Sequence, residues 1–140
     1  MTVSRRDFVA AVVAAGATSG IAATASAADQ CAAGGKGSAV YVIATVTVKP
    51  GKRDEFVRIF KANVPNVLAE NGCVFYSPVV DVASGIEAQG ALRSDVMVVM
   101  EKWESLDALR THLVAPHMNT YREQVKDLVL GVDLQVLQDA

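Results

Sequence analysis

Residues 40–48 alternate strictly between two sets of positions, the pattern of a β-strand. One set is Val40, Val42, Ala44, Val46 and Val48, and the other is Tyr41, Ile43, Thr45 and Thr47. The many β-branched residues favour a strand. Neither set contains a charged residue, so we expect both faces of this strand to be largely covered.

A helical pattern follows the turn at residues 49–52. Apolar residues recur every three or four positions from Phe56 to Leu68, as on one face of an amphipathic helix. Asp54 and Glu55 precede them, where the positive end of the helix dipole stabilises acidic side chains. Pro65 is expected to kink or divide this helix.

Two further strands are predicted, at residues 74–82 and 96–103. Pro78 cannot donate a hydrogen bond to a neighbouring strand, so the first of them should lie at a sheet edge or contain a bulge. Residues 83–95 form a long connection between the two strands. The pattern leaves open whether this connection is a lid, a dimer arm or a plain insertion.

The last third of the chain reads as helix and then strand. Ser105 is a good N-cap for a helix, and Pro116 suits the first turn of a restarted one. Gly131 ends the helical pattern, and the residues after it alternate as a fourth strand.

The predicted order of elements is β-α-β-β-α-β. This order is typical of the ferredoxin-like α+β fold, in which helices cover one face of a four-stranded antiparallel sheet. The other face then has no cover from within the chain, although residues 40–48 are largely apolar or uncharged on both sides. A second copy of the same sheet is the simplest cover, so we expect a homodimer.

The first 39 residues are predicted to lie outside the folded domain. Arg5 and Arg6 precede a weakly apolar, alanine-rich stretch and a small-x-small site at 25–27, which is typical of a twin-arginine export signal. A membrane anchor is the alternative. We expect a signal peptide at 1–27, a flexible linker at 28–39 and one domain at 40–138, located in a bacterial periplasm or outside the cell.

Charge and cysteine content narrow the function. Cleavage of the predicted signal peptide would remove Arg5, Arg6 and Asp7, so that 13 basic and 15 acidic side chains become 11 and 14. This slightly acidic balance argues against a nucleic-acid partner. After cleavage no apolar stretch is long enough for stable membrane association. Cys31 and Cys73 could pair in an oxidising compartment, or Cys73 could remain a buried thiol, and the sequence leaves both open.

No motif predicts a metal or a cofactor. His112 and His117 are five residues apart with Pro116 between them, so they do not share a helix face as an i, i+4 pair of ligands would. The chain has no Cys-x-x-Cys pair, no Gly-x-Ser-x-Gly nucleophile motif and no dinucleotide-binding fingerprint.

Acid–base catalysis is the kind of chemistry that these missing motifs leave open. Glu101 and Trp103 are two apart on a predicted strand and so share a face, and a carboxylate on an apolar face is unfavourable unless it is paired. Histidine is the commonest general base. Structural alternatives stay open: Glu101 paired with an arginine beside a core Trp103, His112 at the surface or capping a helix, and His117 at a helix start.

Three stretches carry a resemblance to a known family. They are "VTVKPGKRDEF" at 46–56, "ENGCVFY" at 70–76 and "VVMEKWESLDALRTHLVAPH" at 98–117. Over about residues 40–130 the chain resembles the antibiotic biosynthesis monooxygenase (ABM) domain, a family that includes small quinol monooxygenases.

The resemblance implies a dimeric α+β barrel that oxygenates electron-rich aromatic alcohols with O₂ in an apolar cavity, without a cofactor. It implies the following roles: His112 as base or substrate-orienting group, Glu101 orienting a partner, Trp103 as cavity wall, Tyr76 and Tyr41 as cavity hydroxyls, and His117 in the site or organising the helix restart.

Two departures from the family pattern matter. Haem-degrading relatives have a helix histidine about ten residues beyond an aromatic, but here His112 holds the aromatic's place and Arg122 follows at that spacing, so haem is not expected. Most relatives are cytoplasmic, whereas the predicted export signal would place this chain outside the cytoplasm. Two alternatives to a monooxygenase stay open: a cofactor-free isomerase, and a dimeric ligand-binding or stress-related protein without catalysis.

Overall fold

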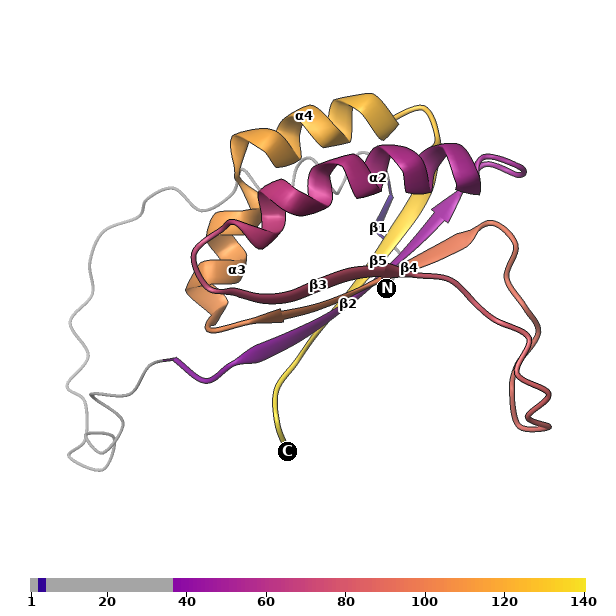
Figure 1. Ribbon diagram of the computed structural model, residues 1–140, viewed down its shortest axis with the longest axis horizontal. Helices are drawn as coiled ribbons and strands as arrows, with labels where there is room; N and C mark the ends of the chain where they lie inside the picture. The colour runs from indigo at the N-terminus through magenta and orange to yellow at the C-terminus, as the bar shows by residue number, and fades with distance from the viewer. Residues whose placement is uncertain (1–2, 5–36) are drawn as a thin grey trace.

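The computed structural model describes residues 3–4 and 37–140, which form one layer of helices on one sheet (Figure 1). The elements are β1 (Val3–Ser4), β2 (Val40–Val48), α2 (Arg53–Leu68), β3 (Cys73–Val79), β4 (Val96–Trp103), α3 (Leu106–Leu113), α4 (Pro116–Val125) and β5 (Val129–Leu137). The predicted signal peptide and linker lie outside the described residues, apart from the short β1 and residues 37–39.

The sheet has the strand order β1-β5-β2-β4-β3, and every neighbouring pair is antiparallel. Without the two-residue β1, this is the four-stranded ferredoxin-like sheet, so the predicted fold class is confirmed. β3 lies at the edge, as Pro78 suggested, and its register with β4 shifts between Cys73 and Phe75.

The two prolines act differently on the helices. Pro116 begins α4, so the second helical region is divided into α3 and α4 as predicted. Pro65 lies inside α2, which continues beyond it to Leu68, so of the two expected outcomes, a kink or a division, the division does not occur. Near a C-terminus few hydrogen bonds lie beyond the proline, and Ala69 N–H still bonds to the Pro65 carbonyl.

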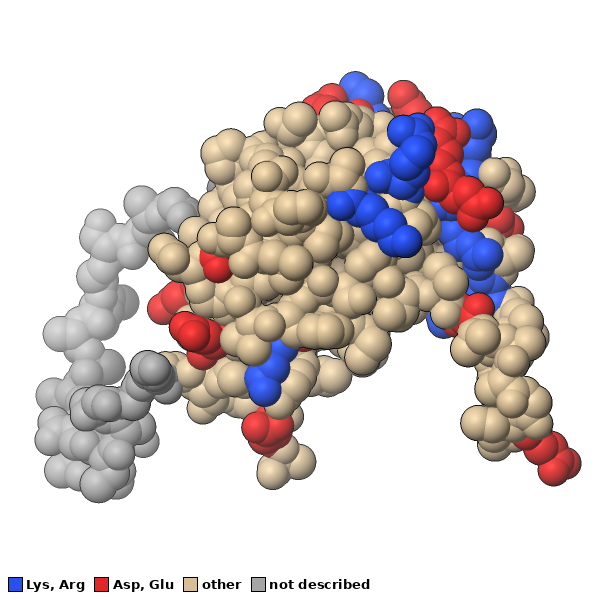
Figure 2. Space-filling view, viewed as in Figure 1, with Lys and Arg blue, Asp and Glu red and all other residues tan. Residues whose placement is uncertain are grey.

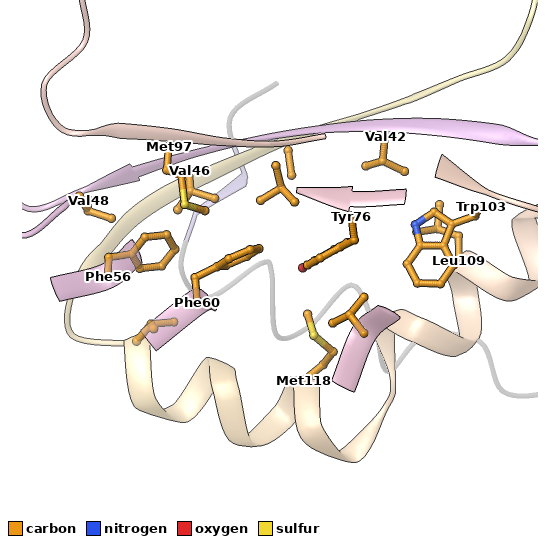
Figure 3. Close-up of a cluster of buried hydrophobic side chains, with 14 of the residues drawn as sticks. Val42, Val46, Val48, Phe56, Phe60, Tyr76, Met97, Trp103, Leu109 and Met118 are labelled. Carbon is orange, nitrogen blue, oxygen red and sulfur yellow. The ribbon is translucent and has the colours of Figure 1, made fainter. Parts of the chain in front are cut away.

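The core lies between the sheet and the helices (Figure 3). β2 buries every second residue from Val40 to Val48, and β4 does the same with Met97, Val99, Glu101 and Trp103. The helices contribute Phe56, Phe60 and Val67 from α2, Leu109 and His112 from α3, and Met118 and Val125 from α4. Among the described residues, fifteen hydrophobic side chains are buried, and the two buried ionisable side chains are Glu101 and His112.

The opposite face of the sheet has no helix over it (Figure 1). On this face Phe75 is 48% exposed and Met100 is 46% exposed, and Val79 is also exposed. Ile43 lies beside Met100 and is half-buried. The expectation that both faces are covered is therefore not met within one chain. We call this apolar surface the open sheet face.

The connection between β3 and β4, residues 80–95, projects from the body as an arm (Figure 1). Arg93 binds Asp81 at its base through both carboxylate oxygens, at 2.8 and 2.7 Å. The arm exposes Val82 and Ile86, and Figure 2 shows its charged side chains mainly at the base and the tip. No arm residue lines the cavity between the sheet and the helices, so the structure does not support a lid.

Among the described residues, no helix has the length and apolar character needed to cross a membrane.

Candidate active site

A cavity of about 130 Å³ lies between the helix-covered face of the sheet and the helices. Its walls are mainly apolar, with Ala44, Val46 and Val99 from the sheet and Phe60 and Met118 from the helices. Six polar side chains also line it: Tyr76, Glu101, His112, Tyr121, Arg122 and Lys126. The cavity therefore combines an apolar interior with a few converging groups that hold or donate protons.

Glu101 reaches the cavity because β4 alternates, which places its side chain on the helix-covered face beside Val99 and Trp103. It is only 7% exposed, and the indole Nε1–H of Trp103 donates a hydrogen bond of 2.8 Å to its Oε2. The alternative in which Glu101 pairs with an arginine was wrong, since its partner is this indole. Burial raises the pKa of Glu101 to about 7, against the lowering effect of the Trp103 hydrogen bond.

His112 lies in the last turn of α3 and is 1% exposed, so the alternative of a surface histidine was wrong. Its ring packs against Trp103 with centroids 4.6 Å apart and meets Tyr76 edge-on at 5.6 Å. Its Nδ1 lies 2.9 Å from Oε1 of Glu70. Burial lowers the pKa of His112, and the Glu70 carboxylate opposes that effect.

His117 is brought to the same carboxylate but not to the cavity. Its Nε2 lies 2.8 Å from Glu70 Oε1, and the ring is absent from the cavity wall. His117 belongs to the first turn of α4, directly after Pro116. The structure thus places His117 at the helix restart, beside Glu70 and outside the cavity wall.

The two tyrosines predicted for the cavity lie on opposite sides of the sheet. Tyr76 lines the cavity and stacks on Phe60, with centroids 5.5 Å apart and the rings nearly parallel (Figure 3). Burial raises its pKa. Tyr41 is on the open sheet face, where Lys102 Nζ lies 4.9 Å from its ring centroid. Tyr41 is therefore not a cavity hydroxyl, because its strand position has the opposite parity to the buried set.

Three residues in or beside the cavity were not predicted as site residues. Tyr121 and Arg122 line the cavity from α4, and Glu70 lies outside its wall, in the turn after α2. The Arg122 guanidinium donates to the Leu113 carbonyl at 2.7 Å and to Asn119 Oδ1 at 3.0 Å, which ties α3 to α4. Glu70 lies within the quoted stretch "ENGCVFY", but its 42-residue separation from His112 left no spacing signal.

Metal and thiol chemistry receive no further support from the part of the chain that the structure describes. No group of three or more His, Cys, Asp or Glu side chains there could hold a metal ion. Cys73 is a free thiol, and burial raises its pKa to about 11, so it is a poor nucleophile at neutral pH. Cys31, the other half of the possible pair, lies outside the described residues.

The raised pKa of Glu101 predicts a stability effect. Between its ordinary value of 4.5 and about 7, the folded state holds this proton and the unfolded state does not. The free energy of unfolding should therefore fall as pH rises through that window, by about 3 kcal/mol in total. Glu101→Gln stays neutral and should be more stable than wild type by up to that amount above pH 7.

Urea unfolding at several pH values measures this effect. Wild type and Glu101→Gln should have similar stability near the lower end of the window and diverge as pH rises. Glu104→Gln is the matched control, because it removes the same charge from an exposed position and should follow wild type. Parallel pH profiles for wild type and Glu101→Gln would show that Glu101 is not held neutral by burial.

Comparison with known proteins places the chain among relatives. Residues 39–124 match the family model described as antibiotic biosynthesis monooxygenase. The chain is 41% identical over 103 residues to a protein of Escherichia coli K12 named probable quinol monooxygenase YgiN, covering 69% of this chain and 94% of that protein.

Solved structures agree on the fold. PA3566 from Pseudomonas aeruginosa superimposes with a TM-score of 0.63 at 24% identity, covering 76% of this chain and 99% of that chain. Rv0793 from Mycobacterium tuberculosis gives 0.60 at 28% identity, covering 74% and 96%. The first of these shows a shared fold alone, since its sequence identity is low.

Proposed function

This chain belongs to the antibiotic biosynthesis monooxygenase family, and on that premise we propose that it oxidises quinols or related electron-rich phenols with O₂, without a cofactor. The family and the 41% identity to YgiN support a monooxygenase-like function. One observation carries the finer proposal: an imidazole held by a carboxylate lines an otherwise mainly apolar cavity.

The proposed reaction begins with proton removal. His112 takes the phenolic proton of the substrate at Nε2, because Nδ1 is already directed at Glu70. The resulting phenolate is electron-rich enough to reduce O₂ directly. For a hydroquinone, one oxygen atom enters the ring and the other leaves as water, so that a hydroxyquinone is formed and all the electrons come from the substrate.

The other cavity residues support this chemistry by position. Apolar walls exclude water, which would otherwise protonate the phenolate or divert a radical or peroxide intermediate. Glu101 holds the Trp103 indole in place, and this indole packs on the His112 ring. Glu101 therefore orients a partner of the base. Trp103, expected to be a cavity wall, does not line the cavity and packs on the base instead.

The cavity volume limits the substrate. An engineered protein cavity of about 150 Å³ binds benzene, so a cavity of about 130 Å³ has room for one aromatic ring. We therefore expect single-ring hydroquinones and catechols to be better substrates than fused-ring compounds of the same redox potential.

Oxygen uptake by the purified protein tests the proposal. A panel of hydroquinones and polyphenols would be used with a metal chelator present and with autoxidation subtracted. The proposal requires uptake above background and a product with one more oxygen atom and two fewer hydrogen atoms than the hydroquinone. Equal turnover without O₂ would favour an isomerase. Ligand-dependent thermal stabilisation with no product would favour a binding protein.

We propose that the protein is a homodimer joined through the open sheet face. Exposed Phe75, Val79 and Met100 support this proposal, because one chain leaves them in water. Met100→Arg should convert the dimer to a monomer in sedimentation experiments, since it would bury an unpaired charge at the interface. Leu106→Arg, on an exposed position of α3, is the matched control and should stay dimeric. A monomeric wild type would contradict the proposal.

We also propose twin-arginine export to the periplasm or the cell exterior, on the evidence of Arg5, Arg6 and the small residues at 25–27. Cell fractionation tests the proposal. Replacing both arginines by lysine should retain the uncleaved chain in the cytoplasm, and export of that variant would overturn it.

A further inference from the structure

We infer that Glu70 is a positioning residue that sets the tautomer and the basicity of His112. The inference rests on the proposed function for its catalytic meaning, but its structural content can be measured without turnover. Glu70 lies outside the cavity wall and reaches the chemistry only through His112.

Glu70 is held in place from both sides. It lies in the turn between α2 and β3, where its own N–H bonds to the Val67 carbonyl and its carbonyl accepts from Cys73 N–H. Its side chain is 14% exposed. One oxygen, Oε1, lies 2.9 Å from His112 Nδ1 and 2.8 Å from His117 Nε2. A single carboxylate oxygen thus joins the α2–β3 turn to α3 and α4.

The carboxylate decides which His112 nitrogen carries the proton. An ionised carboxylate only accepts hydrogen bonds, so Nδ1 of neutral His112 must be the N–H donor. Nε2 then has the lone pair and is the basic atom. When Nε2 takes a proton, the imidazolium is formed in a site where burial opposes charge, and the adjacent negative charge offsets that penalty.

His117 modulates this arrangement. Its positive form would compete for the same Glu70 oxygen and repel a protonated His112, which lowers the pKa of His112. Arg122 acts in the same direction. The other titratable groups around Glu70 and His112 are Cys73, Tyr76 and Glu101.

Nitrogen-15 NMR of the histidine rings in the full-length protein tests the inference directly. In wild type, neutral His112 should show the Nδ1–H tautomer. In Glu70→Gln the tautomers should mix and the pKa of His112 should fall, because the charge that stabilises the imidazolium is gone. The control variant is Glu104→Gln. It removes an exposed carboxylate just before α3, the helix that carries His112, and should leave the His112 signals unchanged.

Kinetics supply the second readout. Glu70→Gln should lower kcat about 10- to 100-fold with little change in KM, and the acidic limb of the pH–kcat profile should move to lower pH. Glu70→Asp should recover part of the loss. A structural role alone would lower activity or stability without moving that limb.

The outcomes separate this inference from the proposed function. Glu70→Gln could change the tautomer and the titration of His112 while wild type takes up no oxygen with any substrate. That result would support the positioning role of Glu70 and contradict the proposed monooxygenase activity. An Nε2–H tautomer in wild type, or an unchanged His112 titration in Glu70→Gln, would overturn the positioning role whatever the activity.

Discussion

Replacing His112 by alanine is expected to lower substrate-dependent oxygen consumption by about 10²- to 10⁴-fold. The imidazole is the cavity group that combines a free ring nitrogen with a fixed orientation, because Glu70 binds Nδ1 while Trp103 and Tyr76 pack on the ring. Without it the phenol stays protonated, and a neutral phenol is a much weaker reductant of O₂ than its anion. Initial rates of oxygen uptake measure the loss.

Two further variants separate base chemistry from packing. His112→Phe keeps an aromatic ring against Trp103 but has no basic atom, and it should be as inactive as His112→Ala. Tyr41→Phe removes a hydroxyl from the open sheet face and should retain wild-type rates. High activity in His112→Phe would mean that the ring only fills space and that another group removes the proton.

Replacing Trp103 by alanine should destabilise the fold by about 3–5 kcal/mol. The indole is fully buried, with 0% exposure, and it packs on the His112 ring. Its removal leaves a large cavity and deprives the buried Glu101 of its hydrogen-bond donor. Urea unfolding at one fixed protein concentration measures the change, since dimer dissociation would otherwise contribute.

Trp103→Phe and an exposed control define the mechanism of that loss. Trp103→Phe keeps much of the apolar volume and loses the Nε1–H donor, so it should be destabilised by less than the alanine variant. Leu106→Ala, at an exposed position of α3, should stay within about 0.5 kcal/mol of wild type. A loss below about 1 kcal/mol in Trp103→Ala would show that the indole is not a core residue.

Much of the fold followed from local patterns. Strict alternation in residues 40–48 and helical spacing from Phe56 to Leu68 each depend on neighbouring residues alone, so both elements could be predicted. Pro116 marked a helix start for the same local reason. For Pro65 the pattern left a kink or a division open, and α2 is not divided, because the consequence of a proline depends on how many turns of helix follow it.

Part of the candidate site was also within reach of the sequence. Glu101 and Trp103 had to share a strand face because side chains alternate along a strand, and the structure joins them by a hydrogen bond. The sequence did not show that the partner of Glu101 is an indole and not an arginine, since this depends on which elements pack over β4.

Which residues share a face could be predicted from the amino-acid pattern, because strand and helix periods are local properties of the chain. The pattern could not decide which of two similar faces the helices cover, and that choice placed Tyr76 in the cavity and Tyr41 on the open sheet face. The contacts of Glu70 with His112, 42 residues further along the chain, and with His117 are made by packing and leave no periodic trace in the sequence.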